Sequence, residues 1–432
     1  MPRPIVCLLF AVAAWAQPPA SFTLAGDWAV QVSVPGAAPQ VLRVAPPVIR
    51  SVTAEKHLTL PLFTPQAGGW ARGARLEGLR SQETTSPYLL DPASFALRAG
   101  PSPESLLFTS GVDYELDPVW GTFGRLPGSR IAADQPVYAT YRHAQMRLDA
   151  VVLTAAGKIA LRPGEPRAAA PSLAVLAPGD RHLGNIYLPR GIAKLETDHL
   201  FPILESAHPE PPRGPRHPVI ERLVRRLQAG QPLRILAWGD SVTDATYLPD
   251  RDTQRWQEQF VVRLRQQYPQ ARIEMLTQAW GGRNTGSYLA EPPGSPHTYT
   301  ETVLAVKPDL VISEFVNDSG LTPPRVEERY AKLLADFQAI GADWIILTPH
   351  YVQPERMAFT REREIDQDPR PYVEGLRQFT AKHNVPLADA SLRYGRLWRQ
   401  GIPYNTLLLN AINHPDARGM RLFADALMAL FR

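Results

Sequence analysis

The spacing of apolar residues divides the chain into two parts of different character. From about residue 21 to residue 204, apolar residues occur in short alternating or β-branched runs that Pro and Gly interrupt, which predicts strands and hardly any helix. Three such runs, at 137–142, 147–154 and 158–161, predict adjacent antiparallel strands. The first part of the chain is therefore expected to be an all-β domain, either a sandwich or a barrel-like sheet.

After residue 218, short apolar runs alternate with longer segments of helical periodicity. Strands are predicted at 233–238, 272–276, 310–314, 344–348 and 386–388, and helices at 256–268, 326–340, 372–383 and 417–431. This alternation favours an α/β fold of three layers, in which helices cover both faces of a parallel sheet. The active site of such a sheet lies beyond the carboxyl ends of its strands.

Proline marks the boundary between the two parts. Residues 206–218 contain five prolines, which favour an extended and semi-rigid chain. The total of 432 residues also exceeds what one hydrophobic core usually serves. We therefore predict a β-rich accessory domain at 17–205, a Pro-rich linker at 206–218 and an α/β domain at 219–432.

The N-terminus predicts an exported protein. Arg3 precedes an apolar run at 5–14 and an Ala-x-Ala site that ends at Ala16, which is the pattern of a signal peptide at 1–16. The run is shorter than the roughly 20 residues that cross a bilayer, so we expect no membrane span after cleavage. The mature protein is expected to be secreted or periplasmic. Cys7, the single cysteine, lies inside this segment, so the mature chain is expected to contain neither a disulfide nor a cysteine-bound metal.

Charge and short motifs exclude several other functions. The formal net charge is +4, and the basic residues are scattered arginines without interleaved aromatic residues, so a nucleic-acid partner is not expected. The sequence contains no H-E-x-x-H segment and no paired cysteines, so neither a metal nor a cofactor is predicted. It also contains no G-x-S-x-G segment, which argues against the α/β-hydrolase nucleophile turn. The oligomeric state is left open.

Residues with catalytic chemistry follow the predicted strands. Ser241 ends a Gly-Asp-Ser segment directly after the first strand, where its hydroxyl and its N–H can both face a site. Gly282 follows the second strand, and a glycine there lets the backbone approach a substrate. Asn317 follows the third strand as a fixed amide donor, and His414 precedes the final helix.

Taken together and in this order, these four segments resemble the SGNH (GDSL-like) hydrolase superfamily over residues 234–432. The resemblance implies a flavodoxin-like fold and a serine esterase in which Ser241 is the nucleophile and His414 is the base. It also implies that Gly282 and Asn317 are oxyanion donors together with the N–H of Ser241. These roles are chemically consistent, because a serine hydroxyl needs a base to take its proton and the tetrahedral oxyanion needs preorganised donors.

Two positions depart from the pattern of the family. Phe315 replaces a glycine, and we expect its bulky side chain to narrow or reshape the pocket. Ala411 occupies the place of the aspartate that the family has three residues before His414. Asp389, at the end of the last predicted strand, is our candidate for the missing acid, with helix capping as its alternative role. Asn410 or a backbone carbonyl orienting the imidazole, or a slow enzyme without an acid, are the other interpretations.

The resemblance implies ester hydrolysis more firmly than it implies a substrate. The family includes acetyl and carbohydrate esterases, lipases, lysophospholipases and thioesterases. Export and the β-rich domain favour removal of acetyl or short acyl groups from an extracellular polysaccharide. Trp70, Trp120 and Phe123 are candidates for a surface on which sugars stack, with core packing as the alternative. The alternative functions are a glycan-binding protein with a catalytically weakened domain, which Ala411 suggests, and an esterase of the lipase or lysophospholipase type.

Overall fold

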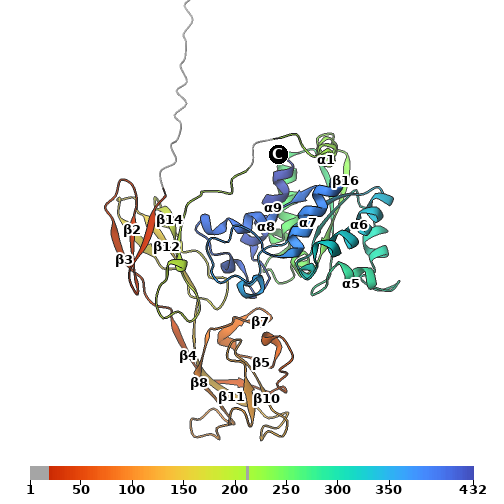
Figure 1. Ribbon diagram of the computed structural model, residues 1–432. Helices are drawn as coiled ribbons and strands as arrows, with labels where there is room; N and C mark the ends of the chain where they lie inside the picture. Colours follow the sequence, from red (N-terminus) through yellow and green to blue (C-terminus); the bar gives the residue numbers. More distant parts are fainter. Residues whose placement is uncertain (1–18, 211–213) are drawn as a thin grey trace, which may run out of the picture.

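The computed structural model describes residues 19–210 and 214–432. The predicted signal peptide, with Cys7, and the middle of the predicted linker lie outside these residues. Figure 1 shows an all-β part, coloured red to yellow, next to an α/β part, coloured green to blue. In the described part of the chain, no helix is long and apolar enough to cross a membrane. The order of all-β then α/β agrees with the prediction from the sequence.

Two small sheets form the lobe of the β-rich part that contains both its first and its last strands. One sheet contains β1 (Ser21–Gly26), β2 (Ala29–Ser33) and β3 (Gln40–Arg43); the other contains β12 (Arg147–Leu153), β13 (Ile159–Arg162), β14 (Arg181–Leu188) and β15 (Leu200–Pro202). A common apolar cluster that includes Val30, Val151 and Ile186 packs these two sheets together. The lobe therefore combines segments from both ends of the β-rich part.

The strands between these segments form a second lobe (Figure 1). Its sheets contain β4 (Ile49–His57), β8 (Leu90–Arg98) and β11 (Val137–Ala144), and β5 (Ala74–Arg75), β9 (Tyr114–Leu116) and β10 (Thr122–Arg125); β6 (Arg80–Ser81) and β7 (Thr84–Thr85) form a separate hairpin. β12 and β13 pair as the sequence predicted. β11 does not pair with β12 as expected. It pairs with β4 and β8, because the chain passes from one lobe to the other between β11 and β12.

A parallel sheet of five strands, in the order β17-β16-β18-β19-β20, forms the centre of the α/β part. Its strands are β16 (Pro232–Gly239), β17 (Arg272–Ala279), β18 (Leu310–Glu314), β19 (Asp343–Leu347) and β20 (Leu387–Ala388). All five are predicted strands, with small shifts at their ends. Because β16 has β17 on one side and β18 on the other, the strand order reverses at β16. Ligands of such sheets bind at this reversal, beyond the carboxyl ends of the strands.

Helices cover both faces of this sheet, as the prediction of three layers requires. Ile235 of β16 faces a core that it shares with α1 (Pro218–Gln228), α4 (Trp256–Gln267) and α9 (Ala417–Leu430). Leu236 faces the opposite core, which contains α5 (Thr285–Ala290), α6 (Pro323–Ala339) and α7 (Pro371–His383). The shorter helices are α2 (Ser241–Asp244), α3 (Arg251–Gln254) and α8 (Ala390–Gly395). Helix α1 was not predicted from the sequence, although its apolar residues have helical spacing.

The buried carboxyl group of Glu362 leads to a prediction about how stability depends on pH. Asn405 Nδ2 donates to Glu362 Oε1 at 2.8 Å, whereas the buried Oε2 atom has no hydrogen-bond partner among the described residues. Burial raises the pKa of Glu362 to about 7, although Arg190 and Asn405 oppose the rise. In the unfolded chain this carboxyl has its ordinary pKa near 4.5. Folding therefore favours the protonated form, and this contribution to stability is lost as the pH rises from about 4.5 through about 7.

The Glu362→Gln variant removes this titration and keeps the size of the side chain. We expect the variant to match the parent protein near pH 4.5 and to melt a few degrees higher at pH 8, as measured by calorimetry across this range. Glu364→Gln is the matched control, because the Glu364 side chain is 55% exposed. A difference in melting temperature that stays constant from pH 4.5 to pH 8 would contradict the prediction.

Candidate active site

Ser241 lies at the end of the central strand. β16 ends at Gly239, and Asp240 caps the single turn of α2 by accepting a hydrogen bond from the N–H of Val242. A Cβ atom at Gly239 would lie 2.2 Å from Thr243 Oγ1, so the tight turn needs a glycine there. Ser241 is partly exposed and is the first residue of the helix. The turn therefore presents its side chain at the carboxyl edge of the sheet.

The carboxylate of Asp240 joins two of the predicted catalytic segments. Its Oδ1 atom accepts from the N–H of Val242 at 3.0 Å, and its Oδ2 atom accepts from the N–H of Asn317 at 2.9 Å. Burial raises the pKa of Asp240, against the lowering effect of these N–H donors. One buried side chain thus holds the Ser241 turn and the Asn317 loop at a fixed separation.

Gly282 belongs to the loop that follows β17. Trp280 donates its N–H to the carbonyl of Gly239 at 3.1 Å, which fastens this loop to the Ser241 turn. A Cβ atom at Gly281 would lie 3.8 Å from Ser241 Cβ, so the glycine pair passes close to Ser241. Gly282 has a φ of +72°, a backbone conformation that side chains disfavour. This backbone conformation therefore explains the glycine at position 282, in a loop that passes next to Ser241.

Asn317 lies in a single 3₁₀ turn, Val316–Asp318, after β18. The neighbouring Asp318 is buried and accepts hydrogen bonds from Thr285 Oγ1 at 2.7 Å and from the Tyr330 hydroxyl at 3.1 Å. These bonds fasten the Asn317 turn to α5 and α6, while the Asn317 side chain remains partly exposed. The amide of Asn317 is thus held by a rigid backbone at the same sheet edge as Ser241.

His414 reaches this edge from the loop before α9. Its imidazole stacks on the ring of Tyr247, with centroids 4.1 Å apart and an angle of 5° between the planes. Tyr247 follows α2, so the stacking places His414 against the segment that carries Ser241. His350 Nε2 lies 2.9 Å from the carbonyl oxygen of Asn413, so a second histidine contacts the same loop. Within the described residues, Ser241 Oγ makes no hydrogen bond to the imidazole, and the Tyr247 segment provides the connection.

A match to a known family supports the reaction class of this site. Residues 237–422 match the model of the GDSL-like Lipase/Acylhydrolase family. The C-terminal domain is a GDSL-like hydrolase domain. This match supports an enzyme that hydrolyses ester bonds. A search of curated protein sequences found no match.

Matches to solved structures cover about half of this chain. One is LAE5, an α/β hydrolase enzyme from the metagenome of Lake Arreo in Spain, with 19% identity, a TM-score of 0.36, and coverage of 46% of this chain and 94% of LAE5. Another is a two-domain esterase (CEX) active on acetylated mannans and co-crystallised with mannopentaose, with 17% identity, a TM-score of 0.38, and coverage of 48% and 52%. TesA has 18% identity, a TM-score of 0.34, and coverage of 46% and 98%.

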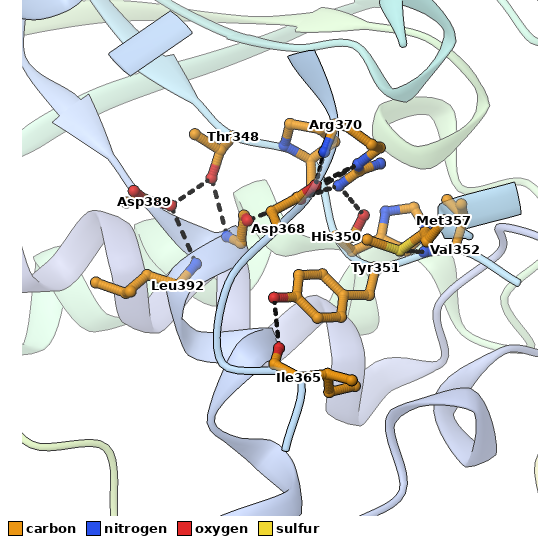
Figure 2. A network of polar contacts seen from close by, with 12 residues as sticks. Thr348, His350, Tyr351, Val352, Met357, Ile365, Asp368, Arg370, Asp389 and Leu392 are labelled. Atoms are coloured by element: carbon orange, nitrogen blue, oxygen red, sulfur yellow. Dashed lines mark hydrogen bonds and ion pairs between the residues drawn. The ribbon is translucent and has the colours of Figure 1, made fainter. Parts of the chain in front are cut away.

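The structure does not bring Asp389 of the GDSL-like domain to His414, which corrects the expected role of Asp389 as the acid. Asp389 accepts from Arg377 Nε at 2.9 Å, from Thr348 Oγ1 at 3.0 Å and from the N–H of Leu392 at 3.0 Å. Figure 2 shows the contacts with Thr348 and Leu392. The Asp389 carboxylate is paired with Arg377 and caps the N-terminus of α8. The alternative role of Asp389 as a helix cap is therefore the one observed.

A different carboxylate, which was not predicted from the sequence, reaches the imidazole. Glu83 lies in the two-residue turn between β6 and β7, and its Oε1 atom lies 3.3 Å from His414 Nδ1. Asn410 Nδ2 donates to the same Glu83 oxygen at 2.9 Å, across 327 positions of sequence. Glu83 has no motif around it and belongs to the β-rich part, so no signal in the sequence pointed to this contact.

The expectation that Phe315 narrows the pocket is wrong. Its ring is 1% exposed and packs edge-on against Trp238, with centroids 4.8 Å apart. Phe315 belongs to the apolar cluster between the sheet and helices α5 to α7. Successive side chains at a strand end point to opposite sides, so the residue before the Asn317 turn faces the core.

Proposed function

We propose that this protein is an exported serine esterase that removes acetyl or short acyl groups from a polysaccharide. Ser241 is the nucleophile and His414 is the base. The oxyanion donors are the N–H groups of Ser241 and Gly282 and the side-chain amide of Asn317. The observation that carries the proposal is that the Asp240 carboxylate, the Gly239 carbonyl and the Tyr247 ring fasten these four segments together at one sheet edge.

The reaction follows from these positions in two stages. His414 takes the proton of the Ser241 hydroxyl while Oγ attacks the ester carbonyl, and the new oxyanion accepts hydrogen bonds from the three donors. The imidazolium then gives its proton to the leaving alcohol oxygen, and the acyl group remains on Ser241. Water attacks this acyl ester, again with His414 as the base, and releases the acid and the free serine.

One aromatic pair supports a polysaccharide substrate. Trp70 and Trp120 are partly exposed, and their rings lie 5.4 Å apart in an edge-on arrangement. The guanidinium of Arg356, from the GDSL-like domain, lies 4.8 Å from the Trp70 ring centre. A partly exposed pair of this kind can stack against the apolar faces of sugar rings. Phe123 is fully buried, so it belongs to the core and not to this surface.

Hydrolysis of a chain-length series tests the proposed function. The purified protein is expected to cleave p-nitrophenyl acetate and butyrate faster than p-nitrophenyl laurate, and to release acetate from acetylated polysaccharides. A preference for laurate or for lysophospholipids would assign the protein to the lipase type. Binding of polysaccharide without hydrolysis of any ester would favour the glycan-binding function and contradict the proposal.

A further inference from the structure

We propose that Glu83 of the β-rich part is the residue that positions His414, so that the catalytic triad is completed across the two parts of the chain. The inference rests on the proposed function of Ser241 and His414. It assigns to a hairpin of the β-rich part the role that the aspartate three residues before the histidine has in the family. Glu83 contacts the base and not the ester, so it is a positioning residue.

The contact reaches the nitrogen that an orienting acid must use. Glu83 Oε1 lies 3.3 Å from His414 Nδ1. A carboxylate at Nδ1 favours the tautomer with its proton on that nitrogen, which leaves the Nε2 lone pair free for the hydroxyl proton of Ser241. The same negative charge stabilises the imidazolium that forms when His414 takes that proton.

The hairpin that carries Glu83 is docked on both catalytic loops. Ser81 Oγ donates to the carbonyl of Leu409 at 2.7 Å, and Thr84 Oγ1 donates to the carbonyl of Asn410 at 2.7 Å. On the other side, Gln82 Nε2 donates to the carbonyl of Tyr247 at 2.8 Å. The side chains of the hairpin thus bond to the loop before His414 and to the segment after Ser241. Side chains held in this way keep an orienting carboxylate in one position.

Asn410 connects the hairpin to the backbone of His414. Its Oδ1 atom accepts from the N–H groups of Ile412, Asn413 and His414, at 3.0, 2.8 and 2.9 Å. Its Nδ2 atom donates to Glu83 at 2.9 Å, and Asn410 itself is 1% exposed. Asn410 therefore holds both the histidine loop and the Glu83 carboxylate. It acts on the imidazole through Glu83 and does not orient the ring directly.

The charge of Glu83 is secured by the same contacts. Burial raises the pKa of Glu83, but hydrogen bonds from His414 and Asn410 outweigh this effect and lower it to about 2. Glu83 is thus ionised throughout the pH range in which a histidine can act as a base.

The backbone of the hairpin turn supports a functional role. Gln82, the first residue of the two-residue turn, has a φ of +56°. Tight hairpin turns usually place Gly, Asn or Asp in this region, because larger side chains are strained there. A glutamine is held in this conformation by its bond to Tyr247, and strained backbone of this kind clusters at functional sites.

Gln82 is also the competing partner of the imidazole. Its Oε1 atom lies 3.4 Å from His414 Nδ1. Glu83 is charged, and its Oε1 atom lies 3.3 Å from the same nitrogen as an ion-pair contact, whereas Gln82 offers a hydrogen bond from a neutral group. A neutral amide also cannot stabilise an imidazolium by charge. The structure therefore favours Glu83 as the group that acts on His414.

Steady-state kinetics of Glu83→Gln with p-nitrophenyl acetate test the inference. We expect kcat to fall about tenfold to a hundredfold, with KM changed less than about twofold, because the loss is confined to the step in which the imidazolium forms. The fall is smaller than the roughly 10⁴ of a buried triad acid, because the Glu83 side chain is 52% exposed and water screens its charge. Glu77→Gln, with a side chain that is 64% exposed, is the matched control near the hairpin.

A second-site variant separates positioning from damage to the hairpin. Ala411 has a φ of +56°, a conformation that Asp adopts more readily than Ala, so Ala411→Asp suits the loop. We expect Ala411→Asp to restore part of the kcat that Glu83→Gln loses, since it returns a carboxylate to the place used by the family. A loss of kcat caused by a distorted histidine loop would not be rescued in this way.

One result would overturn the inference while the proposed function stands. It is a Glu83→Gln enzyme whose kcat stays within twofold of the parent while Ser241→Ala is inactive. A parent protein that hydrolyses no ester would instead contradict the proposed function.

Discussion

Substitution of Ser241 by alanine is expected to reduce kcat for p-nitrophenyl acetate by a factor on the order of 10⁴–10⁶, which is the loss seen when a serine hydrolase loses its nucleophile. The hydroxyl oxygen is the atom that attacks the ester, and no other group in the proposed mechanism can form the acyl intermediate. The turn itself depends on the Asp240 cap and on Gly239, neither of which the substitution changes. The variant is therefore expected to melt at the same temperature as the parent.

Labelling with a fluorophosphonate provides a second measurement of the same role. The parent protein is expected to take up one probe molecule at Ser241, and the Ser241→Ala variant none. Ser319→Ala is the matched control, because Ser319 is an exposed serine in the neighbouring Asn317 loop. Equal turnover in the parent and in Ser241→Ala would remove Ser241 from the mechanism.

The Asn317→Ala variant is expected to lower kcat by about 10²–10³, with a smaller change in KM. Its side-chain amide donates to the oxyanion, which exists only after the attack of Ser241, so its loss affects the transition state more than substrate binding. The backbone N–H of Asn317 still donates to Asp240 in the variant, so the loop keeps its position. Kinetics with p-nitrophenyl acetate, combined with thermal melting, measure the effect.

An isosteric substitution sharpens this prediction. Asn317→Asp keeps the size of the side chain but places a negative charge next to the oxyanion, so it is expected to be slower than Asn317→Ala at pH 8. A donor that only binds substrate would give a raised KM and an unchanged kcat. That outcome would exclude Asn317 from the oxyanion hole.

The proposed role of Glu83 gives the β-rich part a function in catalysis. With Ala411 in place of the usual aspartate, the proposed mechanism takes its nucleophile, base and oxyanion donors from the GDSL-like domain and its positioning carboxylate from a hairpin on the other part of the chain. The Ser81, Gln82 and Thr84 bonds show that this hairpin is fitted to the loops of the domain. On this proposal, the accessory part is required for turnover itself, in addition to any role in binding polysaccharide.

Local sequence patterns were sufficient to predict the α/β part. Its strands and helices follow from apolar runs and helical periodicity, which depend on residues close in sequence. The positions of Ser241, Gly282 and Asn317 follow from the same patterns, because each lies directly after a strand and parallel strands end at one edge of a sheet. The sequence patterns by themselves therefore determined the fold class of this domain, whereas the reaction type was implied by the resemblance of its four segments to a known family.

Only the tertiary structure decided which distant groups meet. The pairing of β11 with β4 and β8, and the contact of Glu83 with His414, join segments that no local pattern relates. Asp389 follows a strand end, as the other site residues do, but Arg377 and the N-terminus of α8 occupy its carboxylate. The choice between the two acids depends on how the β-rich part packs against the histidine loop, and such packing is set by the whole fold and not by the residues around either acid.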